Sequence, residues 1–183
     1  MHNFTLHTKE SAPSEAIPLF ENSENAFGMI PNLHAVMAES PQLLEAYQTL
    51  HTLAQKTSFN AEELTVVWQT INVEHACHYC VPAHTAIAKS MKINDKLINE
   101  LRNNEVLSDK KLNTLKTTIL AITRARGVVE DAQLTAFFNA GYQQQQVLDI
   151  ILILAQKVMS NYTNHLANTP VDDAFKPFDW QAK

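Results

Sequence analysis

The residues whose types and spacing indicate chemistry lie in one short segment, from Glu74 to His84. Both cysteines of the chain are here, Cys77 and Cys80, and His84 follows the second cysteine after three intervening residues. Side chains three and four residues apart are neighbours on a helix surface, so a helix over this segment would place two thiols and an imidazole on one face. The segment therefore predicts dithiol redox chemistry assisted by a base.

This chemistry runs as a cycle between a dithiol and a disulfide. The thiolate is the reactive form of cysteine, and the N-terminus of a helix lowers the pKa of a thiol. Cys80 is followed by Val81 and Pro82, and proline suits the first turn of a helix, so we expect Cys80 at a helix N-terminus. One thiolate would attack a peroxide oxygen to give a sulfenic acid, and the second thiol would convert it to a disulfide that an external dithiol reduces.

Two residues near the thiols are candidates for proton transfer. His84 can exchange a proton with a thiol directly or through a water molecule. Glu74 lies three residues before Cys77 and can orient or charge an imidazole, or accept a proton. The segment therefore contains a base and a carboxylate beside the two nucleophiles.

Two other interpretations of the cysteine pair stay open. Cys77, Cys80 and His84, joined by His75 or His78, are residue types that bind zinc, although no second cysteine pair occurs. Two buried, inert thiols are the other alternative, because free cysteine is commonly buried. We prefer the redox interpretation, since a disulfide across so short a loop would contribute little to stability. It requires neither a cofactor nor a metal.

The composition limits the classes of protein to which the chain can belong. Its 183 residues, 45% of them hydrophobic, fit one domain with a sizeable core. The formal net charge of -5 argues against a nucleic-acid partner or an anionic membrane surface. Charged residues interrupt the apolar runs that a signal peptide or a membrane-spanning helix would need. We therefore expect a cytoplasmic protein.

The elements that must position the thiols are predicted to be helices. Only three glycines occur, which favours helices over a turn-rich β fold. Asn60 and Glu63 have the spacing of a capping box, and Ser108 is the expected cap of a later helix. The predicted helices cover 41–55, 60 to beyond 71, 77–80 to 90, 95–103, 108–127, 131–139 and 143–167. The last is nearly continuous in apolar residues through Leu154, so we expect it to be buried in the core or at a subunit interface.

The whole chain, 1–183, is thus predicted to be a single all-α domain. Residues 1–30 contain Pro13 and Pro18, are followed by Pro31, and are expected to form an irregular leader. Residues 171–183 form a tail whose aromatic residues are expected to pack on the body or on a neighbouring chain.

The cysteine segment resembles the signature of the carboxymuconolactone decarboxylase superfamily, and within it the alkylhydroperoxidase D-like branch. That signature is a glutamate, a spacer and Cys-x-x-Cys-x-x-x-His, which corresponds here to residues 77–84. Residues 27–33, 40–41, 72–74 and 175–178 also resemble peroxidase-related members of this branch. The resemblance implies a helical bundle that assembles into a trimer or hexamer and acts as a thiol peroxidase or a disulfide reductase.

The resemblance also implies roles for particular residues. It couples Cys80 most closely to the proton relay, makes Cys77 the more accessible thiol and matches His84 to the histidine of the signature. His78 lies where some members carry an auxiliary histidine. The relay glutamate of the family stands about twelve residues before the first cysteine, where this chain has a threonine.

Two glutamates can take the place of the relay glutamate. Glu74 is preferred because it is next to the thiols in sequence, and Glu63 is the alternative. The expected substrate is an organic hydroperoxide, and the expected reductant is an external dithiol of the lipoyl or thioredoxin type. A lyase like the true carboxymuconolactone decarboxylases, or a disulfide reductase serving another peroxidase, is the alternative function.

Overall fold

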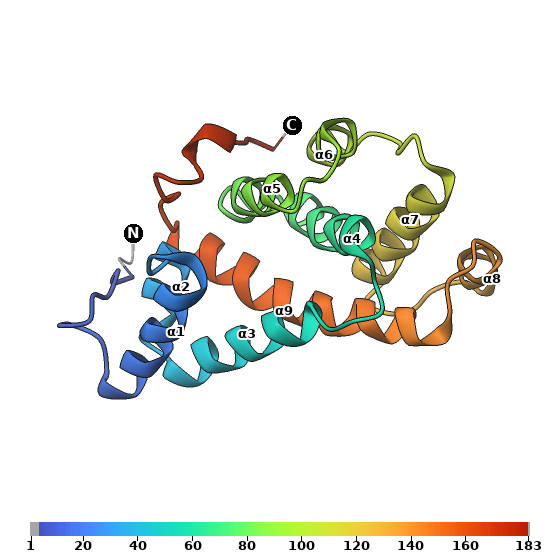
Figure 1. Cartoon of the computed structure of the whole chain (residues 1–183). Helices are drawn as coiled ribbons and strands as arrows, with labels where there is room; N and C mark the ends of the chain where they lie inside the picture. The colour runs from blue at the N-terminus through green and yellow to red at the C-terminus, as the bar shows by residue number, and fades with distance from the viewer. Residues whose placement is uncertain (1–3, 183) are drawn as a thin grey trace.

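The structure is a computed structural model that describes residues 4–182 of the chain. Within this range the backbone forms helices, turns and loops and contains no strand, so the predicted all-α fold is confirmed (Figure 1). The helices are η1 (Ser14–Ala16), α1 (Ile17–Phe27), α2 (Asn32–Met37), α3 (Pro41–Ala54), α4 (Ala61–Glu74), α5 (Cys80–Ser90), α6 (Asp95–Arg102), α7 (Lys110–Arg124), α8 (Asp131–Asn139), α9 (Gln144–Ala167) and η2 (Lys176–Phe178). None of the helices within this range is long and apolar enough to cross a membrane.

The long helix α9 runs obliquely across the molecule in the view of Figure 1, from its start at the lower right toward the upper left. Helices α3 and α4 both pack on it, and α4 also packs on α5 and α7. Helix α2 contacts α9 at one end of the molecule, and α8 lies at the other end against α7. The C-terminal tail returns to α5 through η2, so the expectation that it packs on the body is confirmed.

Two apolar clusters form the core. The larger one lies between α4, α6, α7 and the first half of α9, and its members include Leu115, Ile119, Ile150 and Ile153. The smaller one joins α1, α2 and α3 to the turn that carries both cysteines. The thiols therefore lie inside a packed cluster.

The N-terminal leader contains two helices, which corrects the expectation that residues 1–30 are irregular. Pro18 lies in the first turn of α1. Its missing N–H costs no helix hydrogen bond there, because N–H groups of the first turn have no intrahelical acceptor, and its fixed φ suits a helix. Gly28, with φ of 73°, ends α1 in the left-handed region. Pro31 then precedes the short helix α2, which the sequence analysis missed. The prolines mark helix starts, and residues 1–3 of this leader lie outside the described range.

Helix caps explain where α4 and α7 begin. The capping box between Asn60 and Glu63 is present, as predicted. The cap of α7 is Asp109, whose carboxylate accepts a backbone N–H of the first turn, so the prediction of Ser108 was wrong by one residue. Ser108 instead donates its backbone N–H and its hydroxyl hydrogen to Glu100.

Helix α9 is buried along one side, and this side changes character along its length. Its first half buries Ile150 and Ile153. Its second half buries only polar side chains, each 0% exposed: Gln156, Lys157, Ser160, Asn161 and Asn164. The opposite side exposes Leu148, Ile151, Tyr162 and Leu166. The predicted homo-oligomer stays a prediction.

Candidate active site

The two cysteines lie in a tight turn between α4 and α5. After α4 ends at Glu74, the chain reverses through Ala76, whose φ of 51° lies in the left-handed region. The N–H of Cys77 donates to the carbonyl of Asn72 at 3.0 Å, a bond that closes a Schellman motif. A residue other than glycine in such a conformation costs about 1–3 kcal/mol, so the contacts around it must hold the turn in place.

Buried amides supply these contacts from behind the turn. Asn161 on α9 donates to Asn72 on α4 at 3.0 Å, and Asn72 donates to Gln69 at 3.1 Å. Gln69 donates in turn to the carbonyl of Val81 on α5 at 3.2 Å. His75, which the sequence analysis named as a possible metal ligand, donates to Asn161 at 2.9 Å. The network joins three helices and fixes the thiols relative to the polar half of α9.

Both thiols are free and buried, with Cys77 0% and Cys80 2% exposed. Cys80 is the first residue of α5, and its backbone N–H donates to Sγ of Cys77 at 3.2 Å. Asn164 Nδ2 lies 3.2 Å from Sγ of Cys80 and 3.9 Å from Sγ of Cys77. The two sulfurs therefore share one donor, the amide of Asn164, an arrangement that suits exchange between a dithiol and a disulfide.

A small cavity of about 40 Å³ reaches one of the two thiols. Cys80, His84 and Lys157 line it, together with aromatic and apolar side chains that include Tyr47 and Phe175. Cys77 does not line it and is fully buried. The greater accessibility of Cys77 stays a prediction, because both thiols are buried and, of the two, Cys80 lines the cavity.

His84 lies on α5, one turn after Cys80. Its Nε2 accepts a hydrogen bond from Nζ of Lys157 at 2.9 Å, so the imidazole hydrogen belongs on Nδ1. That Nδ1 is buried and has no hydrogen-bond partner among the described residues. Burial and the charge of Lys157 lower the pKa of His84 well below its ordinary value. A neutral imidazole with a free donor thus lies beside the reactive thiol.

Lys157 determines the charge of the site. Burial opposes ionisation of Cys80, but a hydrogen bond from Cys77 and the charge of Lys157 lower the pKa of Cys80 to about 5. The hydrogen bond with Cys80 and burial raise the pKa of Cys77 above that of an ordinary thiol. These opposite shifts favour Cys80 over Cys77 as the thiolate of the pair.

The sequence analysis missed Lys157 and its polar neighbours on α9. Lys157, Ser160, Asn161 and Asn164 have the spacing i, i+3, i+4, i+7 that puts side chains on one face of a helix. A stripe of this spacing within a helix expected to be buried was the signal that could have found them. The apolar residues through Leu154, which precede this polar stripe, indicate a buried helix and by themselves give no sign of buried polar residues after them.

The structure does not bring either predicted relay glutamate to the thiols. Glu74 accepts two hydrogen bonds from Arg124, at 2.7 and 2.8 Å, near the surface. Glu63 is held by its capping box and accepts a hydrogen bond from Lys111 at 2.9 Å. It lies in the first turn of α4, about 16 Å from Glu74 along the helix axis at 1.5 Å per residue. Both carboxylates are therefore bound to cations away from the sulfurs.

His78, the predicted auxiliary histidine, is half-buried and faces the C-terminal segment. Its Nε2 donates to the carbonyl of Thr169 at 2.9 Å, and its ring lies 6.3 Å from that of His165. It has no hydrogen bond to either sulfur among the described contacts. Within residues 4–182, no three His, Cys, Asp or Glu side chains are grouped to hold a metal ion.

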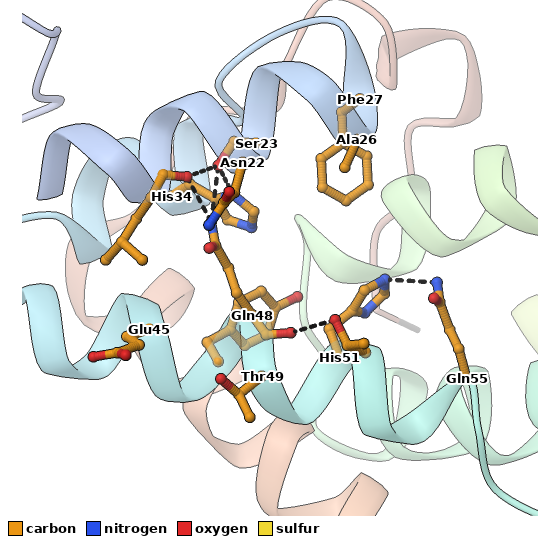
Figure 2. Close-up of a pocket in the computed structure, with 13 residues that line it drawn as sticks. Asn22, Ser23, Ala26, Phe27, His34, Glu45, Gln48, Thr49, His51 and Gln55 are labelled. Carbon is orange, nitrogen blue, oxygen red and sulfur yellow. Dashed lines mark hydrogen bonds between the residues drawn. The ribbon is translucent and has the colours of Figure 1, made fainter.

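A larger pocket of about 560 Å³ adjoins the small cavity, between α1 and α3 (Figure 2). Phe27, His34, Tyr47 and His51 line both spaces. Burial lowers the pKa of His34 to about 3 and that of His51 to about 4, so both rings are neutral at pH 7. The other polar groups of the pocket are amides, hydroxyls and the carboxylate of Glu45, with no lysine or arginine. The approach to the thiol is therefore neutral to acidic.

Solved structures share this arrangement of helices. No protein-family model and no curated protein matches the sequence. An uncharacterised peroxidase-related protein from Ralstonia eutropha JMP134, described as an alkylhydroperoxidase AhpD core, has a TM-score of 0.81 to this chain. The two chains are 17% identical, and the match covers 96% of each. The chain has the alkylhydroperoxidase D-like fold.

Two further structures extend the comparison. A peroxidase-related protein from Silicibacter sp. TM1040 has a TM-score of 0.79 at 19% identity and 95% coverage of both chains. A cysteine-to-alanine variant of the debrominase Bmp8, in complex with 2,3,4-tribromopyrrole, has a TM-score of 0.73 at 18% identity. That match covers 97% of this chain and 95% of the debrominase. The alkylhydroperoxidase D-like fold thus occurs both in peroxidase-related proteins and in a debrominase.

Proposed function

We propose that the chain is a dithiol oxidoreductase that reduces hydroperoxides, with Cys80 as the attacking thiolate and Cys77 as the resolving thiol. One observation carries the proposal: Cys80 lines a small cavity beside His84 and Lys157, and Cys77 lies covered behind it. A nucleophilic thiolate needs access to its substrate, and a resolving thiol needs access only to the sulfenic acid.

The proposed reaction has two chemical steps. The Cys80 thiolate attacks the terminal oxygen of the hydroperoxide, the O–O bond breaks, and the products are a sulfenic acid and an alkoxide that takes up a proton. The Cys77 thiol then attacks the sulfenic sulfur, which forms the disulfide and releases water. An external dithiol of the lipoyl or thioredoxin type returns two electrons and restores the two thiols.

The dimensions and charges of the site favour particular substrates. A cavity of about 40 Å³ holds the peroxide group, and an alkyl group would extend past Phe27 and His51 into the larger pocket. The walls of that pocket offer no cation and contain Glu45. A neutral hydroperoxide therefore suits the approach better than a carboxylate does.

The same charges bear on the lyase alternative. A dicarboxylate needs cations, ideally arginine, to bind both of its carboxylates. Arg124 is paired with Glu74, and Arg102 binds carbonyls of the C-terminal tail. The geometry therefore offers the lyase alternative no support, whereas disulfide reduction uses the same thiols as peroxide reduction. Because a debrominase of this fold binds 2,3,4-tribromopyrrole, that compound is a useful second probe.

Intact-mass analysis of the reduced protein after one equivalent of tert-butyl hydroperoxide tests the proposal. The native chain should lose two hydrogens, and peptide mapping should place a disulfide between Cys77 and Cys80. Cys77→Ser should gain one oxygen atom at Cys80, because the sulfenic acid has no resolving thiol. Cys80→Ser should stay unchanged. Native protein that stays reduced, or oxidation of Cys80→Ser at the native rate, would refute the proposed cycle.

A further inference from the structure

Lys157 is fully buried, and its acidic neighbours are thiols. Burial lowers the pKa of Lys157, and the charges of Cys80 and Cys77 oppose this shift. Its side chain is 0% exposed, and its Nζ donates to His84. The groups facing it from α5 and the preceding turn are His84, Cys80 and Cys77, and those facing it from α3 are His51 and Tyr47. Among residues 4–182, no carboxylate forms an ion pair with it. The Cys80 thiolate is therefore the anion that can balance its charge.

The contacts of His84 connect this cation to the cavity. Its Nε2 accepts from Lys157, and its Nδ1 carries the imidazole hydrogen and has no partner among the described residues. Cys80, His84 and Lys157 all line the same small cavity. His84 therefore connects the amine of Lys157 to the cavity that Cys80 lines.

We propose that Lys157 balances the Cys80 thiolate in the reduced protein and gives up its proton through His84 when that thiolate is oxidised. The proposal rests on the dithiol cycle described above and adds the source of the proton. It also assigns to a lysine on α9 the position in the relay for which a glutamate was expected.

The atoms and charges of the step balance. The Cys80 sulfur forms a bond to the terminal oxygen of the hydroperoxide, and the O–O bond breaks with its electron pair on the departing alkoxide. His84 Nδ1 protonates that alkoxide while Nε2 takes a proton from Lys157. The thiolate and ammonium are thereby replaced by a sulfenic acid, an alcohol and a neutral amine. Anion and cation disappear together, so no unpaired charge is left in the buried site.

Reduction of the disulfide must then return two electrons and two protons. One proton goes to the Cys77 sulfur and the other to Lys157, while Cys80 becomes a thiolate. The protein should therefore take up two protons for each disulfide that is reduced. The reduced protein should nevertheless contain one thiolate. These two properties coexist only when a group other than the two sulfurs binds the second proton.

Two equilibrium measurements near neutral pH test this, and neither uses a peroxide. The first is the ultraviolet absorbance of the thiolate in the reduced protein. The second is the pH dependence of the equilibrium with dithiothreitol, corrected for the ionisation of that reagent, which counts the protons bound on reduction. We expect one thiolate and two protons in the native chain. In Lys157→Met, which keeps the length of the side chain, we expect the thiolate absorbance at neutral pH to be lost.

Lys116→Met is the matched control, because Lys116 is also buried but donates to the carbonyl of Glu105. This variant should keep both native properties. One thiolate with only one bound proton in the native chain would show that Lys157 stays charged on oxidation, and would overturn the proposal. A thiolate that persists in Lys157→Met, with Lys157→Gln as a second variant, would overturn it as well.

These outcomes differ from failure of the peroxide reaction. A dithiol that equilibrates with dithiothreitol as expected, but does not react with hydroperoxide, would refute peroxide reduction and leave the assignment of Lys157 intact. If no disulfide forms between Cys77 and Cys80 under any of these conditions, both proposals are wrong.

Discussion

The two halves of the buried side of α9 have the same helical spacing, but the first half buries apolar side chains and the second half buries polar ones. In the first half, Ile150 and Ile153 are fully buried in the larger apolar cluster. In the second half, the residues one, two and three turns further on are Lys157, Ser160 and Asn164, also fully buried, beneath the cysteine turn. One helix thus joins an apolar core to a buried polar site.

The difference shows where stability and chemistry lie in this molecule. Burying an isoleucine stabilises the fold by about 1.5–3 kcal/mol, whereas burying an ammonium group costs free energy unless an anion balances it. The polar half also leaves His84 Nδ1 without a partner among the described residues, which is unfavourable for folding alone. The apolar half of α9 thus stabilises the fold, and the polar half lowers its stability. This combination is expected where a rigid core holds the polar groups of an active site in place.

The largest effect is expected from the site that the polar half supports. His84→Ala should slow the reaction of Cys80 with hydroperoxide by about 10²–10⁴-fold, the usual range for loss of a general acid or base. Single-turnover kinetics of disulfide formation would measure it. His165→Ala is the control, because His165 is exposed and binds only a backbone carbonyl of the α4–α5 turn. A native rate in His84→Ala would remove the imidazole from the mechanism.

The apolar half should show the reverse behaviour. Ile153→Ala should lower the free energy of unfolding by about 2–5 kcal/mol, because it leaves a cavity in a packed cluster. Urea denaturation measures this, and Leu148→Ala, on the exposed side of the same helix, should change it by less than about 0.5 kcal/mol. The thiol chemistry of folded Ile153→Ala should stay native. A loss of rate comparable to that of His84→Ala would mean that the two halves are not separate.

The smallest effect is expected outside both halves, at the preferred relay glutamate. Glu74→Gln removes an ion pair with Arg124 near the surface, and such pairs contribute about 0.2–1 kcal/mol to stability. The rate of thiol oxidation should be unchanged, because the carboxylate is bound to Arg124. Stopped-flow kinetics beside Glu63→Gln would check this for both candidates. A large loss of rate in either variant would restore that carboxylate to the relay.

Local signals made most of the fold predictable. The capping box at Asn60 and the proline that opens α3 act within one helical turn, so sequence spacing is enough to recognise them. The errors also have local causes. Pro13, Pro18 and Pro31 predict an irregular leader, although proline fits the first turn of a helix as well as a loop.

The candidate site was predictable only where its residues are neighbours in sequence. Cys77, Cys80 and His84 lie within two helical turns, and the structure keeps them together. Glu74 is as close in sequence, but the left-handed turn at Ala76 separates its side chain from the sulfurs. Proximity along the chain predicts proximity in space only while the backbone continues in one helix.

The sequence alone determined that the chain is helical and that two cysteines and a histidine lie together in one short segment. Both properties depend on spacing within one or two turns. Only the tertiary structure decided which thiol lines a cavity and which buried polar side chain lies beside His84. Lys157 lies 73 residues from His84 in the chain and 2.9 Å from it in space. Electrostatic interactions depend on distance and burial, and both are properties of the packed helices.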